Sequence, residues 1–307
     1  MENKKILEKL KKSCSYSSHI SLPSKIDFYL NNNELNLVMS EECVVENMQE
    51  NNAAFEGWCV TLIRWLKEDI NKVILKWSEP DNLDNQHYQR FLYRVKNFNN
   101  MYSWFEIENH QYLNHLKLKF NSKNNYYINV PGEREIEENN NKLDNEKNVE
   151  SVLAAAGINT ETKDILKKEN LSFQLPVGVF NKKPIKDENR IFPGGKSAID
   201  LFGVESDTTY IFELKVNSKM IGILTQIYFY SMIVKAIQKN NLKPAEKNDS
   251  IEKIRATDKL SAYMIADEFH PLIDNKVLDI MNEGIEEIEF KALNFILNKF
   301  SLSYFDR

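Results

Sequence analysis

The chain of 307 residues lacks several features that mark common protein classes. Its only cysteines are Cys14, Cys43 and Cys59, and their wide spacing and odd number predict neither a disulfide framework nor a zinc site. The five histidines are scattered, without the spacing of metal ligands. No apolar run approaches the length of a membrane span, and no apolar stretch follows the charged N-terminal segment as in a secretory signal. We therefore expect a cytoplasmic protein with no membrane partner.

Sequence motifs for nucleotide and ester chemistry are also missing. The segment Gly194-Gly195-Lys196-Ser197 is similar to the end of a phosphate-binding loop, but Arg190 stands where the first glycine is required. No Gly-x-Ser-x-Gly elbow is present. The net charge of −5 disfavours a nucleic-acid-binding surface over the whole chain, although a local basic footprint is sufficient. The basic residues before residue 200 form either such a footprint or a solvated loop: Lys182, Lys183, Lys186, Arg190 and Lys196.

The sequence divides into two parts. Residues 1–130 predict an α+β domain for recognition or regulation, with two strands around the turn Asn31-Asn32-Asn33 and a helix over residues 52–75. Arginines and aromatics alternate over residues 86–102, a pattern that can stack on bases but is more often one side of a core. Residues 131–144 are acidic and asparagine-rich, which predicts a linker. Residues 145–307 form the second predicted domain.

In this second domain, helical and strand patterns alternate. A helix is expected from Asn145 to Ala156, ended by Gly157. Strand patterns follow over residues 173–180 and 197–216, then a buried helix from Ser218 to Gln238. A strand over residues 261–266, a helix over residues 272–282 and a last strand or helix over residues 288–297 complete the chain. This order predicts an α/β core.

The hairpin over residues 197–216 carries the chemistry. Its two apolar runs are separated by the polar residues 205–208. A turn centred between Ser206 and Asp207 places Asp200 directly opposite Glu213, about 5 Å away. Because side chains alternate along a strand, Lys215 lies on the same face as Glu213. We therefore expect two carboxylates and one amine to converge.

Two adjacent carboxylates repel each other unless one takes up a proton or a cation lies between them. Mg²⁺ or Mn²⁺ suits such oxygen ligands, and it would polarise a phosphate and lower the pKa of a bound water. Lys215 would orient that water or neutralise developing charge. The alternative is a weak surface ion pair between Glu213 and Lys215. The apolar residues around them favour a buried strand, where unpaired charge is costly.

Asp200, Glu213-Leu214-Lys215 and Gln226-x-x-x-Tyr230 together resemble the motif of the PD-(D/E)xK nuclease superfamily. The resemblance covers roughly residues 145–300, and Ile199 stands where many members have proline. It implies a restriction-endonuclease-like core, that is, a mixed central sheet flanked by helices. It also implies Asp200 and Glu213 as ligands of Mg²⁺ or Mn²⁺ and Lys215 as a catalytic residue. Gln226 and Tyr230 would position the substrate backbone or the active site, although Gln226 could equally make a structural hydrogen bond.

An upstream helix often supplies a further acid in this superfamily. Glu150 is the candidate here, with Glu146 one turn earlier on the same face; both could instead be plain surface glutamates. The resemblance implies a metal-dependent nuclease that acts on DNA in preference to RNA, for example in defence against foreign DNA, repair or restriction. The alternatives are a nuclease-like protein that binds nucleic acid or a partner without cutting, and a subunit that assembles through its N-terminal part as a homo-oligomer or with a partner protein.

Overall fold

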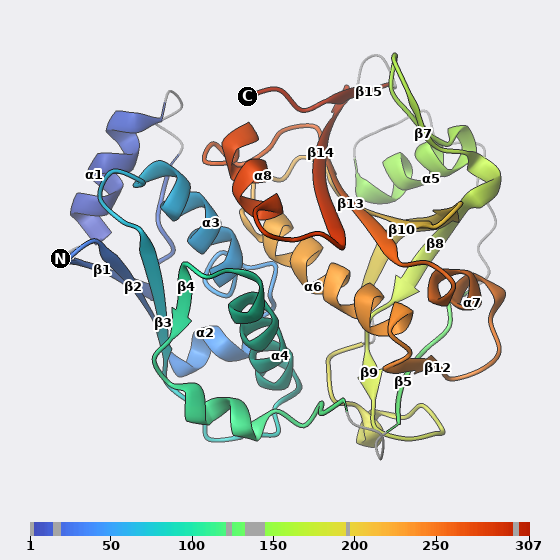
Figure 1. The fold of residues 1–307 in the computed structure, drawn as a ribbon, viewed down its shortest axis with the longest axis horizontal. Coiled ribbons are helices and arrows are strands. Elements are labelled where there is room, and N and C mark those ends of the chain that lie inside the picture. The colour runs from blue at the N-terminus through green and yellow to red at the C-terminus, as the bar shows by residue number, and fades with distance from the viewer. Residues whose placement is uncertain (1–2, 15–19, 121–124, 133–144, 195–196, 297–300) are drawn as a thin grey trace.

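Two lobes of mixed α/β structure lie side by side in the computed structural model of the chain (Figure 1). It describes residues 3–14, 20–120, 125–132, 145–194, 197–296 and 301–307. The predicted linker, residues 131–144, is mostly outside this described part, and the predicted division into two domains stays a prediction. Within the described ranges, every helix is too short or too polar to form a membrane span.

The N-terminal lobe is built around a four-stranded sheet in the order β1-β2-β3-β4. Its elements are α1 (Asn3–Ser13), β1 (Ile26–Asn31), β2 (Glu34–Met39), α2 (Glu41–Val45), α3 (Phe55–Trp65), β3 (Lys72–Trp77), α4 (Gln86–Met101), β4 (Phe105–Ile107) and the 3₁₀ helix η2 (His110–His115). β1 and β2 form the predicted hairpin, and Asn32 and Asn33 both have positive φ, as a tight two-residue turn requires. β2, β3 and β4 run parallel.

The predicted helix over residues 52–75 is wrong in extent. The helix ends at Trp65, and Lys72–Trp77 is a strand. Its residues alternate between buried and half-buried positions, which is the two-residue period of a strand with one face against a core. The sequence pattern does not separate the apolar residues of β3 from those of the preceding helix.

The C-terminal lobe has a six-stranded mixed sheet in the order β15-β14-β13-β11-β10-β8. Its strands are β8 (Leu171–Pro176), β10 (Ala198–Glu205), β11 (Thr208–Lys215), β13 (Lys259–Ala266), β14 (Ile288–Ile296) and β15 (Ser301–Tyr304). β11, β13 and β14 are parallel, whereas β8, β10 and β15 are antiparallel to their neighbours. The predicted α/β class with a mixed sheet is confirmed.

Smaller elements complete this lobe. They are α5 (Glu146–Ala156), β6 (Ile158–Asn159), β7 (Asp164–Leu166), η3 (Lys168–Asn170), η4 (Asp187–Asn189), α6 (Gly222–Gln238), α7 (Asp249–Arg255) and α8 (Asn275–Asn282). The predicted bounds of α5 are confirmed: the Asn145 side chain accepts a hydrogen bond from the Asn148 N–H, and Gly157 follows with φ of 82°. The strand predicted over residues 173–180 is interrupted after Pro176. Its last residues form β9 (Val179–Phe180), which pairs with β5 (Tyr126–Ile128), and β5 pairs with β12 (Leu242–Pro244).

Helices cover both faces of the six-stranded sheet. The apolar side of α5, with Val149 and Leu153, packs against Phe212 and Leu214 of β11. α6 covers the opposite face, contacts α3 and α4 of the other lobe, and joins one hydrophobic core that extends through both lobes. The contact between α6 and the N-terminal lobe is close, because a Cβ added to Gly222 would lie 2.0 Å from the backbone oxygen of Gln49.

Candidate active site

The hairpin of β10 and β11 has the predicted register. Leu201 pairs with Phe212, and Glu205 pairs with Thr208 across the turn. Regular pairing of the two strands ends at Leu201 and Phe212, next to Asp200. The Oδ2 atom of Asp200 accepts a hydrogen bond of 2.8 Å from the Leu214 N–H. The carboxylate of Asp200 therefore takes the place of a backbone partner and is held beside the end of β11.

The neighbouring strand is irregular at the same level. β8 pairs with β10 on either side of Asp200, through Leu175 opposite Ile199 and Phe173 opposite Leu201. Gln174 lies between those pairs and has φ of 52°, a left-handed conformation that is uncommon for residues other than glycine. The pairing of β8 with β10 is thus interrupted at Asp200. Rare backbone conformations such as that of Gln174 are often found at functional sites.

Glu213 and Lys215 lie on the same face, as predicted, and form a buried ion pair. Lys215 Nζ is 2.8 Å from Glu213 Oε1 and donates a hydrogen bond of 3.0 Å to the Leu214 carbonyl. It also lies 3.4 Å from Oε1 of Glu146 on α5. Glu213 is 1% exposed and Lys215 is 8% exposed, so this pair is not the solvated surface pair of the alternative interpretation.

The protonation equilibria of the three groups are coupled. Burial, and then the charge of Glu213, raise the pKa of the Asp200 carboxyl well above its ordinary value. Burial also raises the pKa of Glu213, although Lys215 opposes this effect. Burial lowers the pKa of Lys215, but the charges of Glu213 and Asp200 outweigh it and the net pKa is raised. Two carboxylates share one ammonium, and this unbalanced negative charge favours a proton or a further cation.

Two buried oxygens at this site have no hydrogen-bond partner among the described residues: Glu213 Oε2 and Gln226 Oε1. Gln226 lies on α6, and its Nε2 donates a hydrogen bond of 3.2 Å to the Tyr230 hydroxyl. Burial, Glu213 and Asp200 together raise the pKa of Tyr230 well above its ordinary value, which keeps it a neutral phenol close to the carboxylates. Because unpaired buried acceptors are rare, these two oxygens indicate a place for a bound cation or a polar ligand.

A solvent-open pocket of about 630 Å³ gives access to the site. Asp200, Gln174 and Val216 line it together with the first turns of α5, including Glu150. Glu150 is 5% exposed, and its Oε1 accepts a hydrogen bond of 2.9 Å from Gln174 Nε2. The structure thus brings Glu150 to the pocket that contains Asp200, and Glu146 to Lys215, rather than leaving both as plain surface residues.

The donor set fits a small, hard cation. No group of three or more histidine, cysteine, aspartate or glutamate side chains is arranged to hold a metal ion within the described ranges. Mg²⁺ requires fewer, because it commonly binds through one or two carboxylates and completes its coordination with water and substrate phosphate. Asp200 and the unpaired Oε2 of Glu213 would be the protein ligands, and the pocket admits water.

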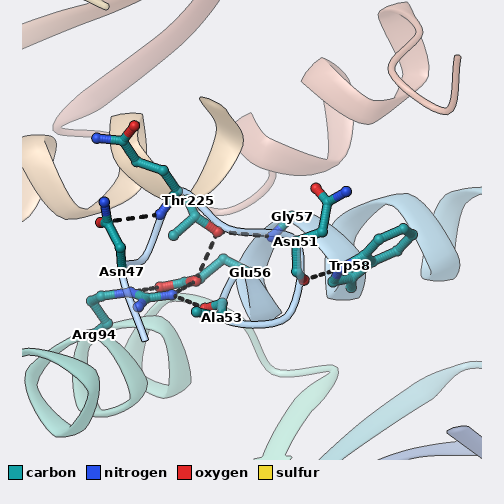
Figure 2. Close-up of polar contacts among 9 residues, drawn as sticks. Asn47, Asn51, Ala53, Glu56, Gly57, Trp58, Arg94 and Thr225 are labelled. Atoms are coloured by element: carbon teal, nitrogen blue, oxygen red, sulfur yellow. Dashed lines mark hydrogen bonds and ion pairs between the residues drawn. The ribbon is translucent and has the colours of Figure 1, made fainter. Parts of the chain in front are cut away.

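Residues of the N-terminal lobe support this site from behind α6, which the sequence pattern did not reveal. Glu56 of α3 accepts hydrogen bonds from Arg94 of α4 and, at 3.0 Å, from the Thr225 hydroxyl (Figure 2). Thr225 immediately precedes Gln226. Arg90, one turn before Arg94, is 2% exposed, and its charge lowers the pKa of Tyr230 against the larger opposing effects. The alternation of arginines and aromatics over residues 86–102 was the only sequence signal for these contacts.

The basic cluster of the sequence lies apart from the carboxylates. Lys182, Lys183 and Lys186 are exposed, Arg190 pairs with Asp187, and Lys196 lies outside the described residues. A comparison with models of protein families, with curated proteins and with solved structures finds no significant match to this chain.

Proposed function

We propose that the protein is a Mg²⁺-dependent nuclease that hydrolyses phosphodiester bonds, with DNA preferred to RNA, on a restriction-endonuclease-like core. The observation that carries the proposal is the convergence of Asp200, Glu213 and Lys215 where pairing of β10 and β11 ends, beside a solvent-open pocket. A helix before the sheet strands, an antiparallel hairpin and a helix crossover to a parallel strand surround this point. Mn²⁺ would substitute for Mg²⁺.

The chain's own residues would divide the chemical work. When bound, the divalent ion supplies positive charge beside the phosphate and activates water. The Leu214 N–H fixes Asp200 so that its carboxylate borders the pocket, and Glu213 offers the unpaired Oε2. Lys215, held by Glu213 and by the Leu214 carbonyl, would stabilise negative charge that develops on the phosphate. Gln226 and Tyr230, which are hydrogen-bonded to each other on α6, would help to position the substrate backbone or the active site.

Glu150 has a positioning role in this proposal. Its hydrogen bond to Gln174 holds the irregular position of β8 opposite Asp200. The negative charge of Glu150 also contributes, as the smallest of several causes, to the raised pKa of Asp200. A third acidic group near the two proposed ligands adds to the attraction for a cation.

A cleavage assay tests the proposal. The full-length protein is incubated with end-labelled linear, circular and single-stranded DNA and with RNA, in Mg²⁺, in Mn²⁺ and in EDTA. We expect cleavage with either metal and none in EDTA. Asp200→Asn, Glu213→Gln and Lys215→Met should each lower the rate at least about 100-fold. The matched control is Lys259→Met, because Lys259 forms an exposed ion pair with Asp207 at the other end of the same hairpin.

Circular dichroism and thermal melting establish that each variant is folded. Cleavage that persists at the wild-type rate in all three folded site variants would overturn the proposal. Metal binding that depends on Asp200, without cleavage of any substrate, would instead favour a nuclease-like protein that binds nucleic acid without cutting it.

A further inference from the structure

A second concave surface lies beyond the end of β8. It is a groove of about 760 Å³ between the segment around β5 and the loop after β9. Its basic residues are Lys117, Lys119, Lys182 and Lys183, all of them exposed. None of its described lining residues is acidic, although the chain as a whole has a net charge of −5. Positive charge is therefore concentrated in this part of an acidic protein. We call the surface formed by these four lysines the lysine groove.

Three side chains of the lysine groove, those of Lys117, Lys182 and Lys183, are available to a ligand. Lys182 forms no ion pair with any residue in the described part of the chain. Lys183 Nζ lies 5.1 Å from the centre of the Tyr127 ring. Lys117 is 2.7 Å from Asp84, but the two side chains are 45% and 70% exposed, and exposed pairs of this kind contribute little free energy. Phosphate groups can thus replace the present partners of Lys117 and Lys183 at little cost.

The chain connects the groove directly to the candidate active site. β8 carries Gln174 opposite Asp200, and β9, which begins three residues after β8 ends, leads into Lys182 and Lys183. The returning segment runs alongside: the Ile191 N–H donates to Val179 O at 2.7 Å, and the Val177 N–H donates to Ser197 O at 3.2 Å. These two segments leave the six-stranded sheet together, and the small sheet of β5, β9 and β12 lies beyond the end of β8 (Figure 1).

The connection limits the distance between the two sites. Eight residues separate Gln174 from Lys182, and a fully extended chain spans at most about 3.6 Å per residue, so their Cα atoms are at most roughly 29 Å apart. A nucleic acid strand in a duplex advances about 3.4 Å per nucleotide. A strand of about ten nucleotides can therefore contact both sites.

We infer that the lysine groove binds the phosphate backbone of a nucleic acid whose scissile bond lies at the candidate active site. This inference rests on the proposed nuclease function and deepens it. Flexible ammonium groups pair with phosphates as point charges, without reading the base sequence. Amide side chains in the same groove, such as Asn181 and Asn125, add hydrogen bonds to phosphate oxygens. A concave surface fits a strand and is poorly shaped for the flat face of a membrane.

Binding is measured in EDTA, so that it does not depend on metal or on cleavage. The probes are a fluorescent 20-nucleotide single strand and the matching duplex, titrated with the full-length protein at several salt concentrations. The test variant has all four groove lysines replaced by glutamine: Lys117→Gln, Lys119→Gln, Lys182→Gln and Lys183→Gln. The matched control removes four exposed lysines elsewhere on the surface: Lys25→Gln, Lys67→Gln, Lys239→Gln and Lys259→Gln.

We expect the four-lysine variant to raise the Kd at least tenfold and to reduce the slope of log K against log salt. The slope should fall by about 0.7 to 0.9 for each lost phosphate contact. A Kd and slope equal to those of the control would overturn the inference. Loss of binding to phosphatidylserine vesicles, with oligonucleotide binding unchanged, would assign the groove to membranes and overturn it as well.

The outcome is separable from that of the proposed function. If the protein binds oligonucleotide through the lysine groove but never cleaves it, the nuclease proposal fails and the groove assignment stands. If it cleaves with unchanged Kd in the four-lysine variant, the nuclease proposal stands and the groove assignment fails.

Discussion

The buried ion pair between Arg94 and Glu56 gives a prediction about stability that can be worked out in detail. The Arg94 and Glu56 side chains are 3% and 1% exposed. Arg94 Nε donates to Glu56 at 2.8 Å, and its Nη2 donates to the Ala53 carbonyl at 2.9 Å. In Arg94→Met, the Glu56 carboxylate would stay buried and keep only the Thr225 hydroxyl among these partners (Figure 2).

The expected cost follows from this geometry. Removing one partner of a buried pair costs about 3–5 kcal/mol, because an uncompensated charge remains. Replacing both residues, as in Glu56→Met with Arg94→Met, removes that charge and leaves polar groups such as the Ala53 carbonyl unpaired, at about 1–3 kcal/mol each. The double variant should therefore be more stable than Arg94→Met alone, and the two substitutions should be strongly non-additive.

Urea unfolding followed by circular dichroism measures these free energies. The control is Lys72→Met, which breaks an exposed pair with Glu106 in the same lobe and should cost less than about 1 kcal/mol. Two results would contradict this reasoning. Arg94→Met could lose no more stability than Lys72→Met, or the effects of Glu56→Met and Arg94→Met on the free energy of unfolding could be additive. Either result would mean that the buried pair of Glu56 and Arg94 does not stabilise the fold as the structure indicates.

Two further predictions concern packing and pH. Gly222→Ala should destabilise the protein by about 1–3 kcal/mol through overpacking, because its Cβ would lie 2.0 Å from the backbone oxygen of Gln49. The control in thermal melting is Gly132→Ala, because no atom lies within 4 Å of the Cβ added there. Equal melting temperatures for both variants would contradict the close contact. Burial, and then the charge of Arg307, lower the pKa of His270 from 6.5 to about 4, so the folded state binds fewer protons than the unfolded state between these values. The contribution of neutral His270 to the free energy of unfolding is therefore fully present above pH 6.5. It is lost as the pH falls towards 4, by up to about 3 kcal/mol. In urea titrations at several pH values, His270→Gln should remove this part of the pH dependence. An unchanged slope of the free energy of unfolding against pH would refute the prediction.

Short sequence patterns predicted those parts of the fold that depend on residues close together in the chain. The register of the Asp200 hairpin followed from alternation and from its polar turn. The bounds of α5 followed from Asn145 at its start and Gly157 at its end. In both cases the residues that determine the structure lie within a few positions of one another, so the sequence contains the whole argument.

Contacts between distant segments were not predictable. Glu56 binds Arg94 and Thr225, which are 38 and 169 positions away, and nothing in the spacing of these residues indicates the pairing. The left-handed Gln174 interrupts a segment that reads as a continuous strand. The roles of Asp200, Glu213, Lys215, Gln226, Tyr230 and Glu150 stay predictions, although the structure brings all six residues to one end of the hairpin and the adjoining helices.

The most direct test is a calorimetric titration of the full-length protein with Mn²⁺. The account predicts a saturable Mn²⁺ site in the wild type that is weakened at least about tenfold in Asp200→Asn and in Glu213→Gln. Asp207→Asn, in the exposed turn of the same hairpin, should bind Mn²⁺ as the wild type does. Identical titration curves for the wild type and both site variants would contradict the claim that these two carboxylates share a divalent ion.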